Sequence, residues 1–167
     1  MLWRILSLAL LKVRMAWWHL VYQGYRSRYA IAPNFRFNGA GIQFYGRGSI
    51  TLGADSYIGE LSTLQAAPGA AIVIGRRCSI SHNVRMYTST ANADTDFRQG
   101  PPPEIIGSVT IGDGVWIGAN CFVSPGVEIG ANAVVGANSV VTKSIPSQEI
   151  WGGVPAKFIR RKRLQPD

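Results

Sequence analysis

The chain has 167 residues, of which 47% are hydrophobic and only 16% charged, and 19 are glycine. This composition favours a single folded domain with short extensions and excludes an intrinsically disordered chain, and the glycine content favours a turn-rich β architecture. The net charge is +8, but no acidic residue precedes Asp55. A second basic run, residues 157–163, lies near the C-terminus. Such basic ends can bind an anionic membrane, a phosphate-bearing cofactor or nucleic acid. The alternative is that they are solvated tails without a partner. No nucleic-acid-binding motif accompanies the charge, so we expect no nucleic-acid partner.

Residues 1–30 are the first expected element, an apolar and basic helical segment. Its uncharged run ends at Lys12 and is therefore too short to span a bilayer, and it lacks the small-residue cleavage site of a signal peptide. Its three tryptophans suit a membrane interface. We expect residues 2–22 to form a helix that lies on the inner membrane surface or packs on a neighbouring subunit. The alternative is a helix that caps the end of the core. The expected location is the cytoplasm of a bacterium, at or near the inner membrane.

A second domain, residues 31–150, carries a six-residue period that is strict from residue 105 onward. Branched aliphatic residues recur at Ile105, Ile111, Ile117, Val123, Ile129, Val135 and Val141. Small or medium residues follow four positions later at Val109, Val115, Cys121, Val127, Ala133, Ser139 and Ile145. Such hexapeptide repeats indicate a parallel β-helix, in which each hexad forms a short strand and a turn and three hexads complete one coil of a triangular prism. Both sets of side chains then point into the prism, so the two cysteines are expected to be reduced packing residues.

The same period is present but less regular before residue 87. The inward positions expected there are Leu52, Ile58, Leu64, Ile74, Ile80 and Met86, and residues 31–50 are expected to form an irregular capping coil. Residues 87–104 interrupt the pattern, because they contain three consecutive prolines and no aliphatic period. We expect this segment to be a loop ejected from the prism, where function is often located. Residues 151–167 are expected to form a short basic extension.

The last third of the domain closely resembles the hexapeptide-repeat acetyltransferases, in particular the maltose, galactoside and colanic-acid O-acetyltransferase type. The resemblance rests on the repeats of residues 109–141 and on the segments VVTK (residues 140–143) and GVPAKFIR (residues 153–160). It implies an all-β fold, a left-handed parallel β-helix, assembled as a homotrimer with active sites between adjacent prisms. It also implies transfer of an acetyl group from acetyl-CoA to a hydroxyl of a cell-surface polysaccharide or its sugar precursor, without a metal ion.

The resemblance further implies which residues bind acetyl-CoA. Trp116 matches a tryptophan beside the cofactor groove, and Ala119 and Ala137 match turn residues whose backbone faces the pantetheine arm. The remaining matches are Thr142 and Lys143, near the far end of the cofactor, and Lys157 and Arg160, near its phosphates. Backbone donors along the arm and cations at the phosphates are what a flexible anionic cofactor requires.

One departure concerns the catalytic base. Ala91 stands where the family usually has a histidine just inside the ejected loop, and the whole chain has only two histidines. His82, in ISHNV (residues 80–84), is the candidate base that remains, because imidazole titrates near neutral pH. The alternative is a surface histidine that makes a corner hydrogen bond. Asn83 matches a family asparagine that lines the acceptor site. Two loop carboxylates, Asp94 and Asp96, are fallback candidates for the base or could equally bind the hydroxyls of the acceptor.

Three other functions are candidates for this scaffold, and the first of them is excluded. A γ-class carbonic anhydrase needs three histidine zinc ligands, and two histidines cannot supply them. The acceptor could be another small molecule, such as an antibiotic or an amino sugar. Finally, the chain could be a catalytically impaired homologue that binds glycan or CoA without turnover, because Ala91 replaces the usual histidine.

Overall fold

The computed structural model describes residues 2–163, which form one long helix, nineteen strands and a short 3-10 helix. The helix is α1 (Leu2–Arg28), and the 3-10 helix is η1 (Phe97–Gln99). The strands are β1 (Ala30–Ile31), β2 (Arg36–Asn38), β3 (Gln43–Gly46), β4 (Ser49–Leu52), β5 (Tyr57–Gly59), β6 (Thr63–Ala66), β7 (Ala71–Ile74), β8 (Ser79–Ile80), β9 (Arg85–Tyr87), β10 (Ser89–Ala91), β11 (Glu104–Ile106), β12 (Val109–Ile111), β13 (Trp116–Ile117), β14 (Phe122–Val123), β15 (Glu128–Ile129), β16 (Val134–Val135), β17 (Val140–Val141), β18 (Glu149–Gly152) and β19 (Lys157–Arg161).

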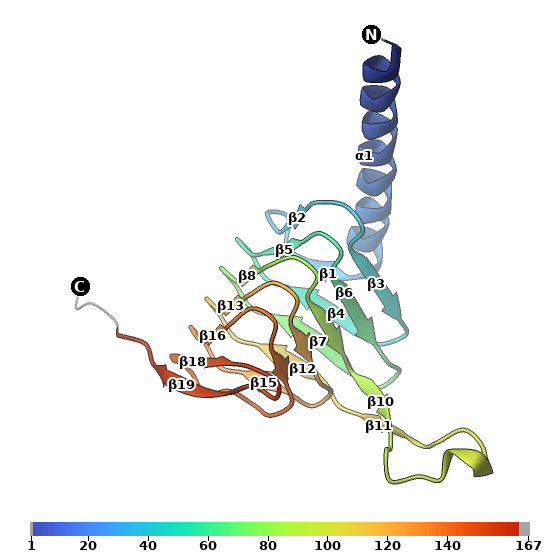
Figure 1. Cartoon of the computed structure of the whole chain (residues 1–167). Helices are drawn as coiled ribbons and strands as arrows, with labels where there is room; N and C mark the ends of the chain where they lie inside the picture. The colour runs from blue at the N-terminus through green and yellow to red at the C-terminus, as the bar shows by residue number, and fades with distance from the viewer. Residues whose placement is uncertain (1, 164–167) are drawn as a thin grey trace.

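Three sheets, parallel except for the last strand β19, form the walls of a triangular prism, which confirms the expected parallel β-helix (Figure 1). Wall 1 is β1-β4-β7-β12-β15, wall 2 is β2-β5-β8-β13-β16-β18-β19, and wall 3 is β3-β6-β9-β14-β17. The chain visits walls 1, 2 and 3 in turn, so that each circuit is one coil. The three edges of the prism are called below the 1–2, 2–3 and 3–1 corners.

The repeat positions fill the centre of the prism. The aliphatic residues from Ile111 to Val141 and the small residues from Val109 to Ile145 are all buried, with at most 2% of their surface exposed. The earlier positions from Leu52 to Met86 are buried in the same way. Ile105 is the exception and the prediction for it was wrong, since it is half exposed and belongs to β11. It pairs with Thr90 of β10 in an antiparallel hairpin, which takes it out of the walls although it keeps the six-residue spacing.

The corners explain the glycines and asparagines of the repeat. Asn120, Asn132 and Asn138 have φ values of 58°, 57° and 58°, as expected for left-handed turn positions. Gly118 is needed for a different reason, because a Cβ atom there would lie 2.5 Å from the backbone nitrogen of Ala137 in the next coil. At Gly118 the coils therefore stack so closely that only a residue without a side chain fits.

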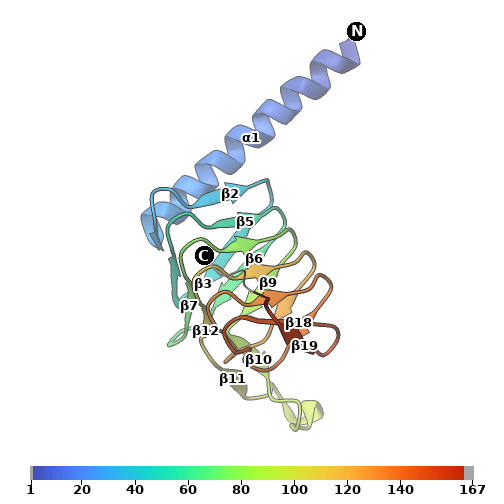
Figure 2. The same cartoon turned by 90° about the vertical axis from the view of Figure 1, so that its left-hand side faces the viewer.

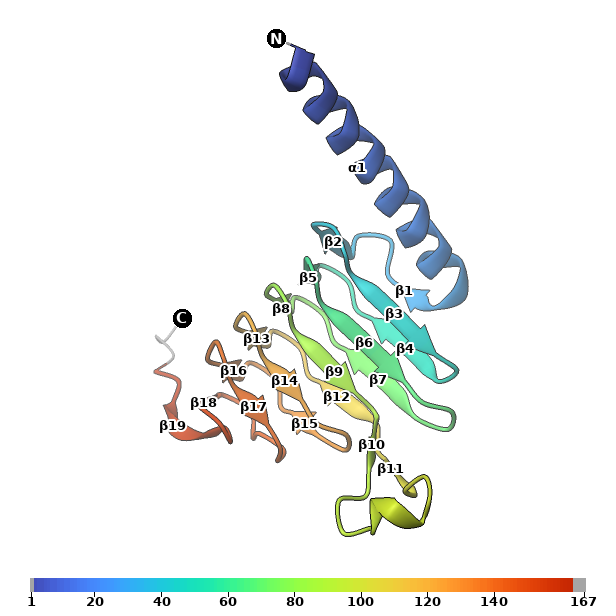
Figure 3. The same ribbon diagram turned by 45° about the vertical axis from the view of Figure 1, so that its right-hand side comes forward.

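The helix α1 closes one end of the prism with its last two turns only (Figures 1 and 3). Tyr25 stacks on Phe44 with ring centroids 4.8 Å apart, and Tyr22 stacks on Phe37 at 4.3 Å. Arg26 donates hydrogen bonds to the carbonyls of Ala32 and Phe35. The irregular coil below it, β1 to β3, is thus sealed by aromatic rings instead of by another coil, which confirms the capping alternative for this part of the helix.

The rest of α1 projects away from the prism (Figure 2). Its side chains from Trp3 to Trp17 are exposed, including large apolar ones such as Leu10 and Val13. The helix is six residues longer than the expected 2–22. By length and composition alone, the helix is long and apolar enough to cross a membrane. This corrects the expectation that the segment is too short to span a bilayer.

The interruption forms a hairpin that leaves the prism at the 3–1 corner (Figure 3). Thr88 is fully buried at its base, where its Oγ1 accepts a hydrogen bond from the backbone N–H of Ala67 and donates one to the carbonyl of Gln65. The strands β10 and β11 form the stalk and η1 lies near the tip. The ejected segment is confirmed, but its second strand extends two residues beyond the expected limit of 104.

The C-terminal segment is not a free tail over the part that the structure describes. After β18, the chain turns at residues 153–156 and returns as β19, which pairs antiparallel with β18. The backbone N–H of Val140 donates to the carbonyl of Gly153, and that of Ala156 donates to the carbonyl of Val140. The last coil is therefore covered by its own chain, while residues 164–167 of the expected extension lie outside the described residues.

Candidate active site

A hollow on the outer face of wall 2, called here the wall-2 hollow, is lined by an aromatic ring and by several positively charged side chains. Its volume is about 430 Å³ and it is lined by Trp116, Val134, Ile150, Arg160, Lys162 and Arg163. Trp116, Val134 and Ile150 occupy the same register on three successive strands of wall 2, so they form a row parallel to the prism axis. Trp116 is 54% exposed, which leaves the indole ring open to a ligand.

The strand β19 supplies the positive charge of the wall-2 hollow. Arg160 pairs in register with Ile150, which places it beside the row that begins at Trp116. Arg161 instead forms an ion pair with Glu149, with 3.6 Å between Nε and Oε1, and does not line the hollow. Lys157 is exposed on the same strand, opposite Gly152, and is also outside the lining. The structure thus brings together Trp116 and Arg160 of the predicted cofactor residues.

The 2–3 corner carries a second group of predicted residues. A ladder of backbone hydrogen bonds runs along it: the N–H of Asn138 donates to the carbonyl of Ala119, that of Asn120 to His82, and that of Asn83 to Glu60. Beside this ladder, the Asn83 side chain donates to Asn120 at 2.9 Å, and Asn120 donates to Asn138 at 3.2 Å. The predicted residues Ala119, Ala137, His82 and Asn83 therefore share one edge of the prism.

The imidazole of His82 is exposed but makes one specific contact. Its Nδ1 accepts a hydrogen bond from the backbone N–H of Glu60 at 3.2 Å. In a neutral ring with this contact, the proton is on Nε2 and the lone pair faces Glu60. His82 is thus arranged as a donor toward solvent. To accept a proton from a substrate, it must turn its ring and release the Glu60 amide.

The other predicted residues lie at the 3–1 corner or in the hairpin that leaves it. Thr142 and Lys143 follow β17 and are exposed. Asp94 is exposed in the hairpin, while both carboxylate oxygens of Asp96 bind Arg98, with 2.9 Å from Oδ1 to Nε and 2.9 Å from Oδ2 to an amino nitrogen. These hydrogen bonds lower the pKa of the Asp96 carboxyl, so this group is a poor proton acceptor.

Comparison with known proteins decides the family. Residues 108–143 match the model of the bacterial transferase hexapeptide family, which comprises six repeats. A putative lipopolysaccharide biosynthesis O-acetyl transferase of Escherichia coli is 34% identical over 134 residues, which cover 74% of this chain and 67% of that protein. The chain belongs to the hexapeptide-repeat acetyltransferase family.

Two further relatives extend this comparison. A putative acetyltransferase of Saccharomyces cerevisiae is 41% identical over 114 residues, but the matched part covers 65% of this chain and only 57% of the relative. The chain thus spans little more than half of the length of that relative. A solved hexapeptide-repeat acetyltransferase of Vibrio cholerae, complexed with acetyl-CoA, superposes with a TM-score of 0.70 at 30% identity, covering 84% of this chain and 75% of that one. The fold of this acetyltransferase family member is accordingly the left-handed parallel β-helix that the resemblance implied.

Sequence reasoning missed part of the wall-2 hollow. Val134 lies 18 residues, one coil, after Trp116, so the repeat alone could have placed it there. Lys162 and Arg163 line the hollow because β19 folds back on β18, and the periodic pattern gives no signal for this reversal.

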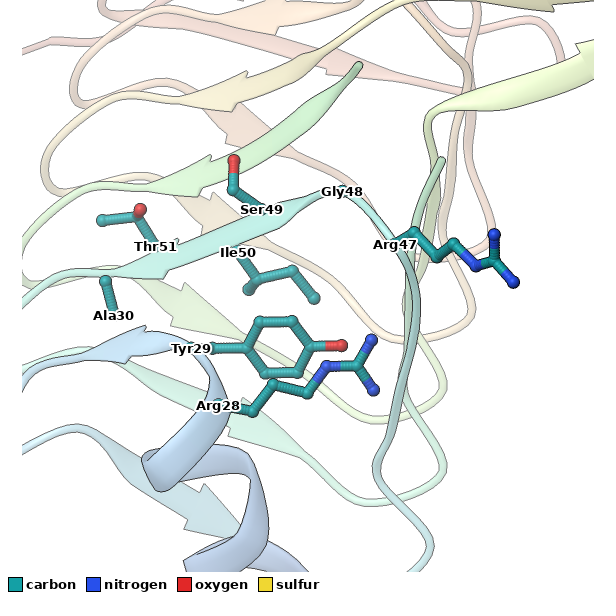
Figure 4. Close-up of a pocket in the computed structure, with 8 residues that line it drawn as sticks. All are labelled: Arg28, Tyr29, Ala30, Arg47, Gly48, Ser49, Ile50 and Thr51. Atoms are coloured by element: carbon teal, nitrogen blue, oxygen red, sulfur yellow. The ribbon is translucent and has the colours of Figure 1, made fainter. Parts of the chain in front are cut away.

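A third feature, at the 3–1 corner beside the base of α1, was also not predicted. Figure 4 shows this hollow of about 360 Å³, with Arg28 alongside the ring of Tyr29 and Arg47 in the facing turn. The Tyr29 hydroxyl is buried and has no hydrogen-bond partner among the described residues. None of the predicted site residues lies there, so this hollow is separate from the candidate active site.

The remaining reactive side chains are part of the core. Cys78 and Cys121 are buried free thiols that donate to the carbonyls of Gly112 and Gly136. Burial raises the pKa of both thiols, which keeps them protonated and unreactive at neutral pH. Within residues 2–163, no cluster of three or more His, Cys, Asp or Glu side chains is placed to hold a metal ion.

Proposed function

We propose that this protein transfers an acetyl group from acetyl-CoA to a hydroxyl of a bacterial cell-surface polysaccharide or its sugar precursor. The observation that carries the proposal is the wall-2 hollow, in which the exposed indole of Trp116 lies beside Arg160 in a chain of the acetyltransferase family. The relative in Escherichia coli is described as a lipopolysaccharide biosynthesis enzyme, which supports a surface glycan as the acceptor.

The chemistry of the wall-2 hollow suits acetyl-CoA. The row of Trp116, Val134 and Ile150 offers a flat apolar strip along which a thin, extended molecule can pack. At its edge, the guanidinium groups of Arg160 and Arg163 provide the paired N–H donors that phosphate groups prefer. In this proposal Lys157 adds a further positive charge on the same strand, and Ala119 and Ala137 present their backbone to the pantetheine arm.

The proposed reaction is a direct transfer. The acceptor hydroxyl attacks the thioester carbonyl, His82 takes the hydroxyl proton, and the CoA thiolate leaves and is protonated. His82 must first turn so that its lone pair faces the substrate, because Nδ1 is occupied by the Glu60 amide in the structure. Backbone N–H groups at the corner would stabilise the oxyanion. Asn83 would orient the acceptor, with Asp94 and Asp96 as further contacts from the hairpin.

The proposal includes assembly as a homotrimer. Trp116 and Arg160 lie on wall 2 and His82 at the 2–3 corner, whereas Thr142, Lys143 and the hairpin belong to the 3–1 corner. If the 3–1 corner of one subunit meets the 2–3 corner of its neighbour, all these residues reach one groove. This arrangement supports a partner that supplies Thr142, Lys143 and the loop aspartates.

We further propose that the enzyme works in the cytoplasm at the inner membrane. The projecting part of α1 exposes large apolar side chains together with Arg4, Lys12 and Arg14, and no acidic residue occurs before Asp55. This combination suits insertion among anionic lipids. A surface glycan on a lipid carrier would then be presented close to the active site.

A second candidate function is a homologue that binds CoA or glycan without efficient turnover. It is favoured by two observations: Ala91 occupies the usual histidine position, and the His82 lone pair is engaged by Glu60. An acetyltransferase for another small acceptor, such as an antibiotic or an amino sugar, is a variant of the first proposal that differs only in the acceptor.

Acetyl transfer and cofactor binding can be tested together. Release of free CoA thiol from acetyl-CoA should rise when surface-glycan intermediates are supplied. Arg160→Ala and Trp116→Ala should each raise the Kd of CoA about tenfold or more in calorimetry, because each removes a contact of about 1.4 kcal/mol or more. Arg161→Ala is the matched control, since this residue is on the same strand but pairs with Glu149. CoA binding without thiol release for any acceptor would favour the second candidate, and an Arg160→Ala variant equal to Arg161→Ala would remove the cofactor from this hollow.

The base is tested by two substitutions at one position. His82→Ala should lower kcat about 100-fold or more, the usual contribution of a general base, with CoA affinity unchanged. His82→Gln should lose as much, because its amide can donate like the Nε2–H but cannot take up a proton. If the kcat of the His82→Gln variant stays within a few-fold of the wild type, His82 acts as a hydrogen-bond donor and the base is another group.

A further inference from the structure

A hollow between α1 and the first two coils contains groups that the proposed function does not use. This cavity, called here the helix hollow, has a volume of about 410 Å³. Its polar and aromatic lining comes from Arg14, Trp18, His19 and Tyr22 of α1, from Phe37 of β2 and from Glu60 of the 2–3 corner, and Ala40 of the same corner also lines it. The volume lies within the range of small-molecule sites.

One wall of the helix hollow is held rigidly. The Tyr22 hydroxyl donates to the carbonyl of Gly39 at 2.8 Å and accepts from the backbone N–H of Ile42 at 3.3 Å. Its ring stacks on Phe37 at an interplanar angle of 9°, and Trp18 lies 5.7 Å from it between centroids. The aromatic surface of the hollow is therefore preorganised by the base of the helix.

The other groups are mixed in charge. Arg14 is exposed and positive, Glu60 is half-buried and negative, and His19 offers an imidazole. Because the positive and negative groups balance, the hollow is not suited to an isolated phosphate. An aromatic face flanked by a carboxylate acceptor and a guanidinium donor instead matches a sugar ring, whose C–H face packs on aromatic rings and whose hydroxyls donate and accept hydrogen bonds.

The position of the helix hollow connects it to the candidate active site. The corner ladder begins at its lining, where the N–H of Leu61 donates to the carbonyl of Ala40 and the N–H of Asn83 to that of Glu60. His82 is on the next rung and its Nδ1 accepts from Glu60 itself. Since coils are spaced by about 4.8 Å, the hollow begins about one sugar ring away from His82 along the same edge.

We propose that the helix hollow is a binding subsite for a neutral hexose unit of the acceptor glycan, next to the sugar that is acetylated. Trp18 packs on the ring face, the Glu60 carboxylate accepts hydroxyl hydrogen bonds, and Arg14 donates to ring or hydroxyl oxygens. This inference rests on the proposed function, because it assigns the acceptor to the edge that holds His82. It gives α1 a role in substrate recognition besides any contact with lipid.

The test compares two neighbouring tryptophans of the full-length protein. Trp18 lines the hollow, whereas Trp17 is 63% exposed and lies outside the lining. With acetyl-CoA and the glycan acceptor of the transfer assay, Trp18→Ala should raise the acceptor KM about tenfold and leave kcat and the KM of acetyl-CoA within about twofold. Trp17→Ala should match the wild type, and Trp18→Phe should recover most of the affinity.

A second variant, in the prism, tests the hollow without changing α1, so that a folding defect of the helix cannot explain its effect. Glu60→Gln keeps the backbone amide that binds His82 and should raise the acceptor KM several-fold. Calorimetric binding of a panel of neutral methyl hexopyranosides, without acetyl-CoA, separates this inference from the proposed function. Binding that is lost in Trp18→Ala and Glu60→Gln supports the subsite even if the wild type transfers no acetyl group. Equal hexoside binding and equal KM in Trp18→Ala and Trp17→Ala would overturn it.

Discussion

The two ends of the prism solve the same packing problem in different ways. In the coils from β12 to β17, each inward side chain meets its equivalents one coil away, and short aliphatic residues such as Ile117 and Val135 suffice. In the first coil there is no preceding coil, and the open end is filled by the rings of Phe35, Phe37 and Phe44 and by α1.

The difference shows why one region has a repeat in its sequence and the other does not. Where coils stack on coils, every position has the same neighbours, so the same residue type is selected each time. Where a helix replaces a coil, each position has its own neighbours. The aromatic cluster at the base of α1 therefore has no period, and several of its rings, such as those of Tyr22, Tyr25 and Phe37, are only partly buried.

The largest expected effect separates the regular coils from the projecting helix. Ile117 is fully buried in the prism, so Ile117→Ala should lower the free energy of unfolding by about 2–5 kcal/mol. Leu11 is 47% exposed on α1, and Leu11→Ala should change it by no more than about 0.5 kcal/mol. Urea denaturation of both variants measures the contrast. Equal losses in the free energy of unfolding would mean that Leu11 is buried in solution as completely as Ile117.

Alanine substitutions at two glycines should change the free energy of unfolding by smaller amounts, with opposite signs. Gly118→Ala should destabilise the protein by about 1–3 kcal/mol, because the new Cβ atom would lie 2.5 Å from the backbone of Ala137. Gly24, in α1, has no atom within 4 Å of the place that a Cβ atom would occupy, and Gly24→Ala should stabilise the helix by about 0.5–1 kcal/mol. Thermal unfolding followed at a helix signal and a sheet signal would resolve the two. A stabilising Gly118→Ala would contradict the close stacking of corners.

The smallest effect is a difference in response to alkaline pH. Burial raises the pKa of Cys78 and Cys121 in the coils and of Tyr22 and Tyr29 at the cap. In each case the unfolded chain loses its proton first, so the stability contribution is complete below the unfolded pKa and is lost as pH rises through the folded one. The coils should weaken from about pH 9.0 and the cap only from about pH 10.0. Unfolding of a Cys78→Ala, Cys121→Ala double variant between pH 8 and 10 should be flatter than that of the wild type, and parallel curves would show that the thiols are not responsible.

The sequence was informative where the packing is local. The six-residue period predicted the inward residues of the coils, and the corners at Asn120 and Asn138 use a residue type that tolerates a positive φ. Ile105 shows the limit of this reasoning: it has the right spacing but pairs with Thr90 in a hairpin, a contact that no periodicity encodes.

The candidate site was predictable in part, because the repeat fixes which residues lie one coil apart. Trp116 was identified through the resemblance, and its register with Val134 follows from the length of one coil. The presence of Lys162 and Arg163 beside it depends on the reversal of β19, and the helix hollow depends on the angle at which α1 leaves the prism. The reversal is set by the pairing of β19 with β18, and the angle by the stacking of α1 on β2 and β3, and neither contact belongs to the six-residue period.

The fold-back of β19 has a consequence for solubility. A stack of parallel coils ends in rows of unpaired amide and carbonyl groups, which can recruit identical molecules into filaments. Here the returning strand binds β18, the turn at residues 153–156 occupies the backbone of Val140, and α1 shields the opposite end. Both ends of the stack are thus partly covered by the chain itself, which favours contact between copies side by side, the direction in which a shared groove can form.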